Sequence, residues 1–318
     1  MIDFRYHLVS IVAIFLALAL GIVLGSTTLS DSVSDTLRQQ ANQAAKTAQQ
    51  ARDQQRQLQQ RTNGQEQFAS VLSPQIVENR LKGQSVVMIE TPGAGDDSIE
   101  QLSELARNAG AAVTGRVTIQ KKLLDDDQQA TVDELATQLK ADDVELPGNA
   151  SAFDKAGAVL ADALVTKDAA ESGREDAAGG AVLNGFKEAG YITSSGKPGQ
   201  HATLAVLVSP ATPYAHEGGG DDNDALISLA SALDAAGRGT VVGGPSTSAQ
   251  EGGLIAALRD SDAEESVSTV DVVDTPSGQV VAILALQNEM SGKTGQYGTG
   301  AGAGGYLPSP APTAGKNG

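Results

Sequence analysis

The sequence has no cysteine and no tryptophan, only three histidines and three methionines, and 3% aromatic residues. Without cysteine it cannot form disulfides, thiolate metal sites or a catalytic thiol. Three histidines leave few members for a catalytic triad, and no serine lies in a Gly-x-Ser-x-Gly motif. The few aromatic rings and the net charge of -17 argue against nucleic-acid binding, which needs a basic surface. We therefore expect neither an enzyme nor a nucleic-acid-binding protein, and no cofactor.

Charge is also absent from residues 8–25, an apolar run in which Ser10 is the only polar side chain. As an α-helix this run would be about 27 Å long, close to the thickness of the hydrocarbon core of a bilayer. The run is longer than the apolar centre of an ordinary signal peptide, although Val23-Leu24-Gly25 could serve as a cleavage sequence. We predict a retained transmembrane anchor over residues 1–26, with a cleaved signal peptide as the alternative.

The charges on either side of the run predict its orientation. The amino terminus and Arg5 precede it, whereas Asp31 and Asp35 follow it and the next basic residue is Arg38. Because positive charge is retained on the cytoplasmic side, we expect a cytoplasmic N-terminus and a bulk that lies outside the cytoplasm, in the cell envelope. The protein would then be a single-pass membrane protein.

The pattern of residues 27–67 predicts a coiled-coil stem. No glycine or proline occurs in this segment before Gly64. Small or apolar residues recur at alternating spacings of four and three, with Gln55 in the one polar place: Leu37, Ala41, Ala44, Ala48, Ala51 and Leu58. An alanine seam allows close approach of two helices but buries little area, so we predict a weak homo-oligomer through the stem. The alternative is a single solvated helix. In either case we expect Gly64 to begin a linker.

Residues 68–300 predict an α/β head domain, and most of the acidic residues lie here. A short buried-type strand at 85–90 is followed by a turn, an amphipathic helix and a second strand. A similar order recurs about 120 residues later, beginning with a strand at 203–209, which makes an internal duplication a candidate. Residues 301–318 are rich in glycine, proline and alanine, and we expect this tail to be disordered.

Other segments of the head have simpler patterns. Residues 128–140 and 151–165 predict helices, and the sequence AAESGREDAAGG at 169–180 predicts an exposed loop. Pro276 begins an apolar helix, and its uninterrupted apolar run at 280–286 is too short for a second membrane span.

Aspartate pairs stand where a helix begins in each repeated unit, at 96–97 and at 221–222. Acidic loops at the carboxyl ends of parallel strands can bind ligands, and four residues could gather a hard cation there: His216, Glu217, Asp221 and Asp222. The alternative is that these aspartates only cap helices and favour the positive end of the helix dipole. The glycines nearby form neither a dinucleotide-binding motif nor a P-loop. We therefore assign no metal site and keep these four residues only as candidates.

The two ends of the chain together resemble a known family. The sequence FRYHLVSIVAIFLALALGIVLG before a coiled-coil stem, and STVDVVDTPSGQVVAILALQ before GQYGTG, are similar to the actinobacterial copper transport outer membrane protein family, the MctB type. The resemblance covers the chain from residue 1 to about residue 300. It implies copper efflux or homeostasis at the cell envelope. A second role that it implies is a membrane-anchored coiled-coil scaffold that acts with a cytoplasmic partner to regulate a peptidoglycan hydrolase.

The residues themselves provide few ligands for copper. Copper(I) prefers thiolate and thioether groups, and the chain offers only Met1, Met88 and Met290. Met88 falls in a strand that we expect to be buried. The sequence thus predicts an anchored extracytoplasmic α/β protein with a copper-transport role and copper as its ion partner. The alternative is the scaffold, with an envelope protein such as a peptidoglycan hydrolase as the partner.

Overall fold

The computed structural model describes residues 4–141, 144, 146, 149–214 and 221–308, with only the backbone described at 26–36 and 221. The chain divides into two compact units, Met1–Gln65 and Glu66–Gly318. Helix α1 (Phe4–Val77) supplies the described part of the first unit and the beginning of the second. The bounds of the other helices are α2 (Asp96–Asn108), α3 (Gln129–Leu139), α4 (Ala152–Leu164), α5 (Ala177–Glu188), α6 (Asp221–Ala236), α7 (Leu254–Arg259) and α8 (Pro276–Glu289). Short 3₁₀ helices are η1 (Lys121–Leu124), η2 (Asp126–Gln128), η3 (Ser246–Ala249) and η4 (Asp262–Glu265).

The first unit is helical throughout its described residues. Its segment Phe4–Gly25 is exposed, has a mean hydropathy of 2.9, and is the one helix of the described residues that is long and apolar enough to cross a membrane. Residues 37–65 are exposed as well. The expectation of a linker at Gly64 is wrong, because α1 continues through Gly64 and through Pro74 to its end at Val77. One glycine costs a helix only about 1 kcal/mol relative to alanine, too little to end it here.

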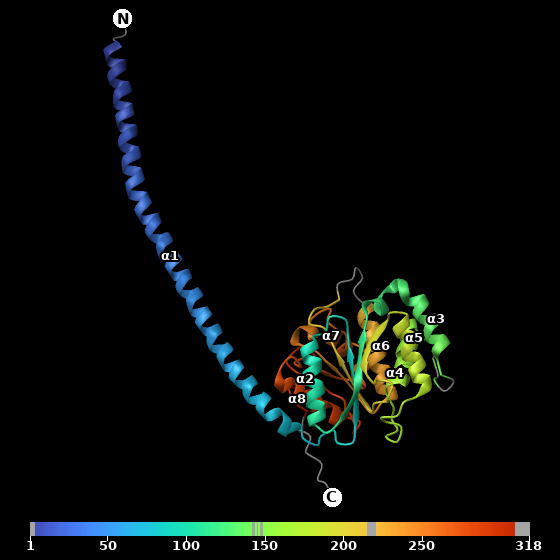
Figure 1. Ribbon diagram of the computed structural model, residues 1–318. Coiled ribbons are helices and arrows are strands. Elements are labelled where there is room, and N and C mark those ends of the chain that lie inside the picture. Colours follow the sequence, from blue (N-terminus) through green and yellow to red (C-terminus); the bar gives the residue numbers. More distant parts are fainter. Residues whose placement is uncertain (1–3, 142–143, 145, 147–148, 215–220, 309–318) are drawn as a thin grey trace. The chain divides into compact units, whose positions relative to one another are not determined.

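The second unit is a seven-stranded sheet with helices on both faces (Figure 1). Its order is β3-β2-β1-β4-β5-β6-β7. All neighbouring strands are parallel except β2 and β3. The strands are β1 (Ser85–Glu90), β2 (Ala112–Ile119), β3 (Ile192–Gly196), β4 (Leu204–Val208), β5 (Thr240–Gly243), β6 (Ser268–Val270) and β7 (Gln296–Tyr297). The predicted α/β class is thereby confirmed.

After β1 the chain continues to β2 on one side of the sheet, and after β4 it continues to β5 on the other side. The unit β1-α2-β2 extends to one side, and β4-α6-β5 extends to the opposite side. Successive residues of a strand point to opposite faces, and Val86 of β1 shares a core with α2 while Val87 shares a core with α6. Helices α2 and α6 therefore cover opposite faces. Both predicted units exist, and their duplication stays a prediction.

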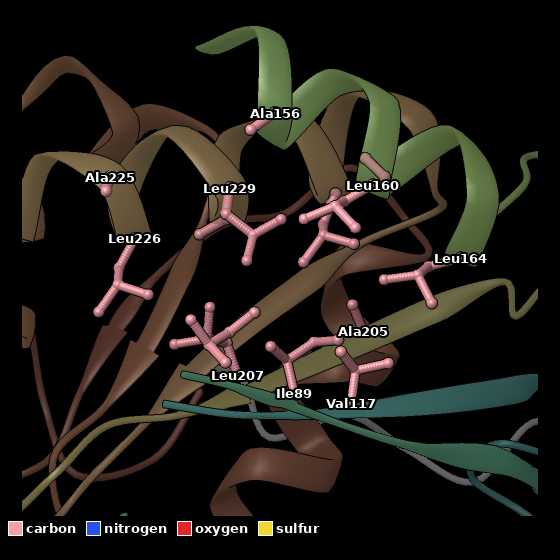
Figure 2. Packing of buried hydrophobic residues seen from close by; sticks show 14 of the residues in the cluster. Ile89, Val117, Ala156, Leu160, Leu164, Ala205, Leu207, Ala225, Leu226 and Leu229 are labelled. Carbon is pink, nitrogen blue, oxygen red and sulfur yellow. The ribbon is translucent and has the colours of Figure 1, made fainter. Parts of the chain in front are cut away.

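The larger core lies on the face that α6 covers. Leu160 of α4 and Leu229 of α6 pack above Ile89 and Leu207 of the central strands, as Figure 2 shows. The start of α4 is fixed by a capping box, in which Ser151 accepts from the Asp154 backbone and Asp154 accepts in return. Helices α3, α4 and α5, which lie between β2 and β4 in the sequence, contribute buried residues to this core.

The smaller core lies on the opposite face, between α2 and α8. Helix α8 is buried along almost its whole length, and Pro276 occupies its first turn with Thr275 as the N-cap. A helix that is apolar all round is expected to be surrounded by protein. The predicted proline-started apolar helix is thus confirmed, and its apolar run belongs to the core.

Two sequence-based expectations about loops are wrong. Residues 177–180 are not loop but the start of α5, because the Asp176 carboxylate accepts hydrogen bonds from the backbone N–H groups of Ala178 and Gly179. Residues 301–308 of the expected disordered tail are placed, since Gly304 N donates to the Gln296 carbonyl at 2.8 Å and Tyr297 bridges Gly305. Residues 309–318 of that tail lie outside the described residues.

Candidate functional site

The direction of the chain reverses between β1 and β4, and open α/β sheets bind ligands at the carboxyl ends of the strands at such a point. Thr91 follows β1 and is completely buried. Its hydroxyl donates to the carbonyl of Val208 at 2.8 Å, and its N–H donates to the same carbonyl at 3.2 Å. These two bonds join the ends of β1 and β4 and form the base of the candidate site.

The acidic residues predicted for this edge are only partly placed by the structure. His216 and Glu217 lie outside the described residues. Asp221 is the first residue of α6, and Asp222 follows it and is 7% exposed. Within the described ranges, no three acidic, histidine or cysteine side chains lie together as a metal site. The four residues therefore stay only candidates, and Asp222 is the one of them whose buried position is known.

Asp96 does not cap α2 but lies with Asp97 in its first turn, so the helix-dipole part of the simpler alternative holds for this pair and the capping part does not. The N-cap residue is Gly95, which has no side chain that could accept a hydrogen bond from the helix. Asp96 instead pairs with Arg116 of β2, whose Nη2 also lies 2.6 Å from Glu90 at the end of β1. Partial burial acts to lower the pKa of Arg116, but hydrogen bonds to Asp96 and Glu90 outweigh it and raise that pKa. The guanidinium thus stays charged and is neutralised by two carboxylates.

Two polar groups near Asp222 were not predicted from the sequence. Asn223 is 5% exposed and its Nδ2 donates to the Gly252 carbonyl at 3.1 Å, whereas its Oδ1 has no hydrogen-bond partner among the described residues. The buried hydroxyl of Tyr214 lies close to Thr91 but does not meet hydrogen-bond geometry. Burial, together with the negative charge of Asp222, raises the pKa of Tyr214. In the part of this edge that the structure describes, the Asn223 oxygen and the Tyr214 hydroxyl are therefore available to bind a small polar molecule.

The C-terminal glycine-rich motif packs at the neighbouring end of β6, where Asp271 is completely buried. The Asp271 carboxylate accepts from Thr299 N at 2.8 Å and from Gly300 N at 3.0 Å. Arg259 Nη1 lies 2.8 Å from Asp271 Oδ2 and also donates to the Ala301 carbonyl at 2.7 Å. The motif GQYGTG, which contains β7, is thus held to β6 both by strand pairing and by the buried Arg259–Asp271 pair. Sequence analysis missed the pair because no local pattern connects its two members.

The remaining candidates for copper ligands lie apart from this edge. Met88 is 1% exposed within β1, and Met290 packs against the smaller core. His201 lines a cavity of about 410 Å³, where its Nε2 is buried and has no hydrogen-bond partner within the described ranges. Asp176 lines the same cavity, and hydrogen bonds from the Gly179 backbone, aided by the charge of His201, lower its pKa. The described residues therefore offer separate single ligands for copper.

The fold and the apolar helix together define an α/β protein with one described helix that is long and apolar enough to cross a membrane. The family described as "Copper transport outer membrane protein, MctB" matches residues 1–308, and the chain belongs to this family. It is 31% identical over 313 residues to "Copper transporter MctB" of Mycobacterium tuberculosis (strain ATCC 25618 / H37Rv), which covers 95% of this chain and 98% of the relative. The protein of the same name from Mycobacterium leprae (strain TN) is 31% identical over 251 residues, covering 74% and 77% of the two chains. The resemblance predicted from the two termini is thereby confirmed.

Proposed function

We propose that this chain takes part in copper transport at the cell envelope, as a membrane-anchored protein whose head lies outside the cytoplasm. The observation that carries the proposal is the family match, which extends over anchor, stem and head together. Curated relatives of nearly the same length, named as copper transporters, support it. The family description names transport and no chemical conversion, so we propose no enzymatic activity.

The proposed topology is a single span with the N-terminus in the cytoplasm. It is supported by the apolar segment Phe4–Gly25 and by Arg5 before it. The lack of cysteine in the natural sequence makes a clean test, since any introduced cysteine is unique. An impermeant maleimide applied to intact cells should label Gln43→Cys and leave Ile2→Cys unlabelled until the cells are opened. The reverse labelling pattern would contradict the topology.

We propose that copper is handled together with other envelope components and not by the head alone. The described part of the head is an open sheet with helices on both faces, an architecture typical of water-soluble α/β domains. Its methionines and His201 are distributed as single ligands, whereas copper(I) sites gather several soft groups. Copper would then be the transported ion, and a partner would complete its coordination.

The second candidate function is a scaffold that regulates a peptidoglycan hydrolase. The observation that favours it is the helical stem, whose residues 37–65 are exposed throughout and carry the alanine seam. An exposed seam of this kind can pair with another helix. Direct copper binding requires the metal ligands of the chain, whereas the scaffold role requires the stem.

A complementation experiment tests the copper role. The full chain would be expressed in a mycobacterial strain that lacks its own copper transporter MctB. We expect it to restore growth on copper and to lower the copper content of the cells. The matched control lacks residues 4–25 and should not restore either property. Normal abundance of the full chain in the membrane without any gain in copper tolerance would contradict the proposal.

A further inference from the structure

A second cavity, of about 450 Å³, lies near the amino ends of β5 and β6, away from the candidate site at the carboxyl ends of the strands. This volume falls within the range of about 300–1,000 Å³ that is typical of small-molecule pockets. Four charged side chains line the cavity: Lys167, Asp234, Arg238 and Glu289. Two carboxylates and two cationic groups are thus brought to one place.

Glu289, the last residue of α8, is the most deeply buried of the four and is only 6% exposed. Ser268 Oγ donates to Glu289 Oε1 in a short bond, and Thr294 Oγ1 lies 3.5 Å from Oε2. The backbone before β5 is also close, since a Cβ atom at Gly239 would lie 2.3 Å from Glu289 Cβ. The carboxylate is therefore held in position, but the hydroxyl groups that hold it carry no charge.

The other three charged groups come from α6 and from the loops after α4 and α6. Asp234 is held in place because its Oδ1 accepts from Thr240 N at 3.1 Å. Arg238 Nη1 donates to Gln84 Oε1 at 3.2 Å, and Lys167 is exposed. Within the described ranges, none of the four groups takes part in a salt bridge, although charges of both signs line one cavity. They are therefore available to a ligand that carries both charges.

Two helices end at this cavity and add to its negative potential. Helix α6 ends one residue before Gly237, which lines the cavity, and α8 ends at Glu289 itself. The C-terminal end of a helix carries a partial negative charge and favours a cation. Burial, with the repulsion from Asp234, raises the pKa of Glu289 to about 7, although its hydroxyl partners act to lower it. A cation bound beside the two carboxylates would offset both effects.

We propose that this cavity binds a small zwitterion of the α-amino acid class. The ammonium group lies against Glu289 and Asp234, because it has three donors and no acceptor and the helix ends favour its charge. The carboxylate of the ligand faces Arg238 and Lys167, since a guanidinium can bind a carboxylate through two parallel hydrogen bonds. Met290 also lines the cavity and offers an apolar contact to the side chain of the ligand. A ligand with charge of one sign would leave half of these groups unused.

Calorimetric titration of the full chain in detergent micelles tests the proposal, with L-leucine as the probe. Two molecules with the same carbon skeleton serve as matched ligands: isopentylamine lacks the carboxylate of leucine, and 4-methylpentanoate lacks its ammonium group. We expect leucine to bind about tenfold more tightly than either, because each analogue loses one set of charge-assisted hydrogen bonds. Isopentylamine that binds as tightly as leucine would overturn the zwitterion assignment, and so would a chain that does not bind leucine.

Two variants assign the two ends of the ligand. Glu289→Gln conserves the shape of the side chain and should weaken leucine about tenfold while leaving 4-methylpentanoate unchanged. Arg238→Gln should weaken leucine and leave isopentylamine unchanged, and its partly exposed position keeps the test independent of the buried carboxylate. Glu188→Gln is the matched control, because Glu188 is also the last residue of its helix but is exposed, and it should bind leucine as the natural protein does. Leucine binding that is unchanged in both cavity variants would overturn the proposal.

Discussion

Arg259 and Asp271 form a buried ion pair, in which Nη1 lies 2.8 Å from Oδ2 and the side chains are 3% and 0% exposed. Both members also bind the C-terminal segment, Asp271 through the N–H groups of Thr299 and Gly300 and Arg259 through the carbonyls of Tyr297 and Ala301. A buried pair stabilises a fold only when its remaining hydrogen-bonding positions are satisfied. Here backbone groups of the GQYGTG motif satisfy them.

The first prediction concerns this pair. Asp271→Asn should lower the free energy of unfolding by about 3–5 kcal/mol, because it leaves the Arg259 charge buried without a counter-charge. Urea unfolding of the full chain in detergent measures the effect. The control is Lys197→Met, which breaks the exposed pair with Glu175 and should cost less than about 1 kcal/mol. Equal stabilities of the two variants would show that the buried pair is not what holds the motif.

The second prediction concerns the glycines of the C-terminal segment. A Cβ at Gly298 would lie 2.1 Å from Asp271 Oδ1, and its φ of +131° is one that other residues rarely adopt. Gly298→Ala should therefore displace the carboxylate and lower the unfolding temperature by several degrees. At Gly304 the nearest atom to a Cβ is 3.7 Å away, so Gly304→Ala should change little. A Gly298→Ala protein as stable as Gly304→Ala would contradict this account.

The third prediction tests the stem seam. Lysine at both Ala44 and Ala48 should weaken self-association, because two like charges would meet where the helices approach most closely. Lysine at Gln43 and Gln50 adds the same charge away from the seam and serves as the control. Sedimentation of the full chain in detergent compares the three proteins. If the natural chain is already monomeric at high concentration, the seam is only a solvated helix face.

The fourth prediction separates copper binding by the chain from the scaffold role. Direct binding must use the few available ligands, so His201→Ala, His216→Ala and Met290→Leu combined should abolish copper tolerance. Exchange of methionine for leucine conserves volume, and protein abundance in the membrane checks the fold. A scaffold should tolerate these changes and instead lose function on deletion of residues 39–61, which shortens the stem by about 35 Å. Because we propose that copper is not handled by the head alone, we expect the triple variant to keep copper tolerance, and its loss at normal abundance would overturn that expectation.

Local patterns were sufficient for the elements whose burial follows from their own sequence. Strand β1 and strand β4 are short runs of branched apolar residues, and α8 has both a proline start and an apolar body. Helix α5 was missed because its glycines indicated a loop. Packing accounts for Gly179, because a Cβ there would lie 3.2 Å from Ala163 Cα, whereas a Cβ at Gly180 would meet nothing within 4 Å. Only the neighbouring helices reveal that reason.

The candidate site was predicted even less completely. The sequence placed Asp222 at the start of the helix that follows a parallel strand, and the structure places it there, at the beginning of α6. Asn223 and Tyr214 were missed, since an unused hydrogen-bonding atom becomes visible only when every neighbour is placed. Arg259 and Asp271 were missed because the pairing depends on residues from α7, β6 and the C-terminal segment together.

The pairing of β1 with β4 has a consequence for the order in which the head folds during synthesis. Ser85 and Thr203, at the starts of these strands, are bonded to each other across 118 residues of chain. Contacts of such long range form slowly, because a large loop must close before they contribute. Strand β1 can pair with β2 as soon as residue 119 has been made, but its other edge stays open until the chain beyond Thr203 is available. The charges of Arg259 and Asp271 receive their backbone partners later still, from residues 297–301, so the sheet is completed only when the last strand of the head has been made.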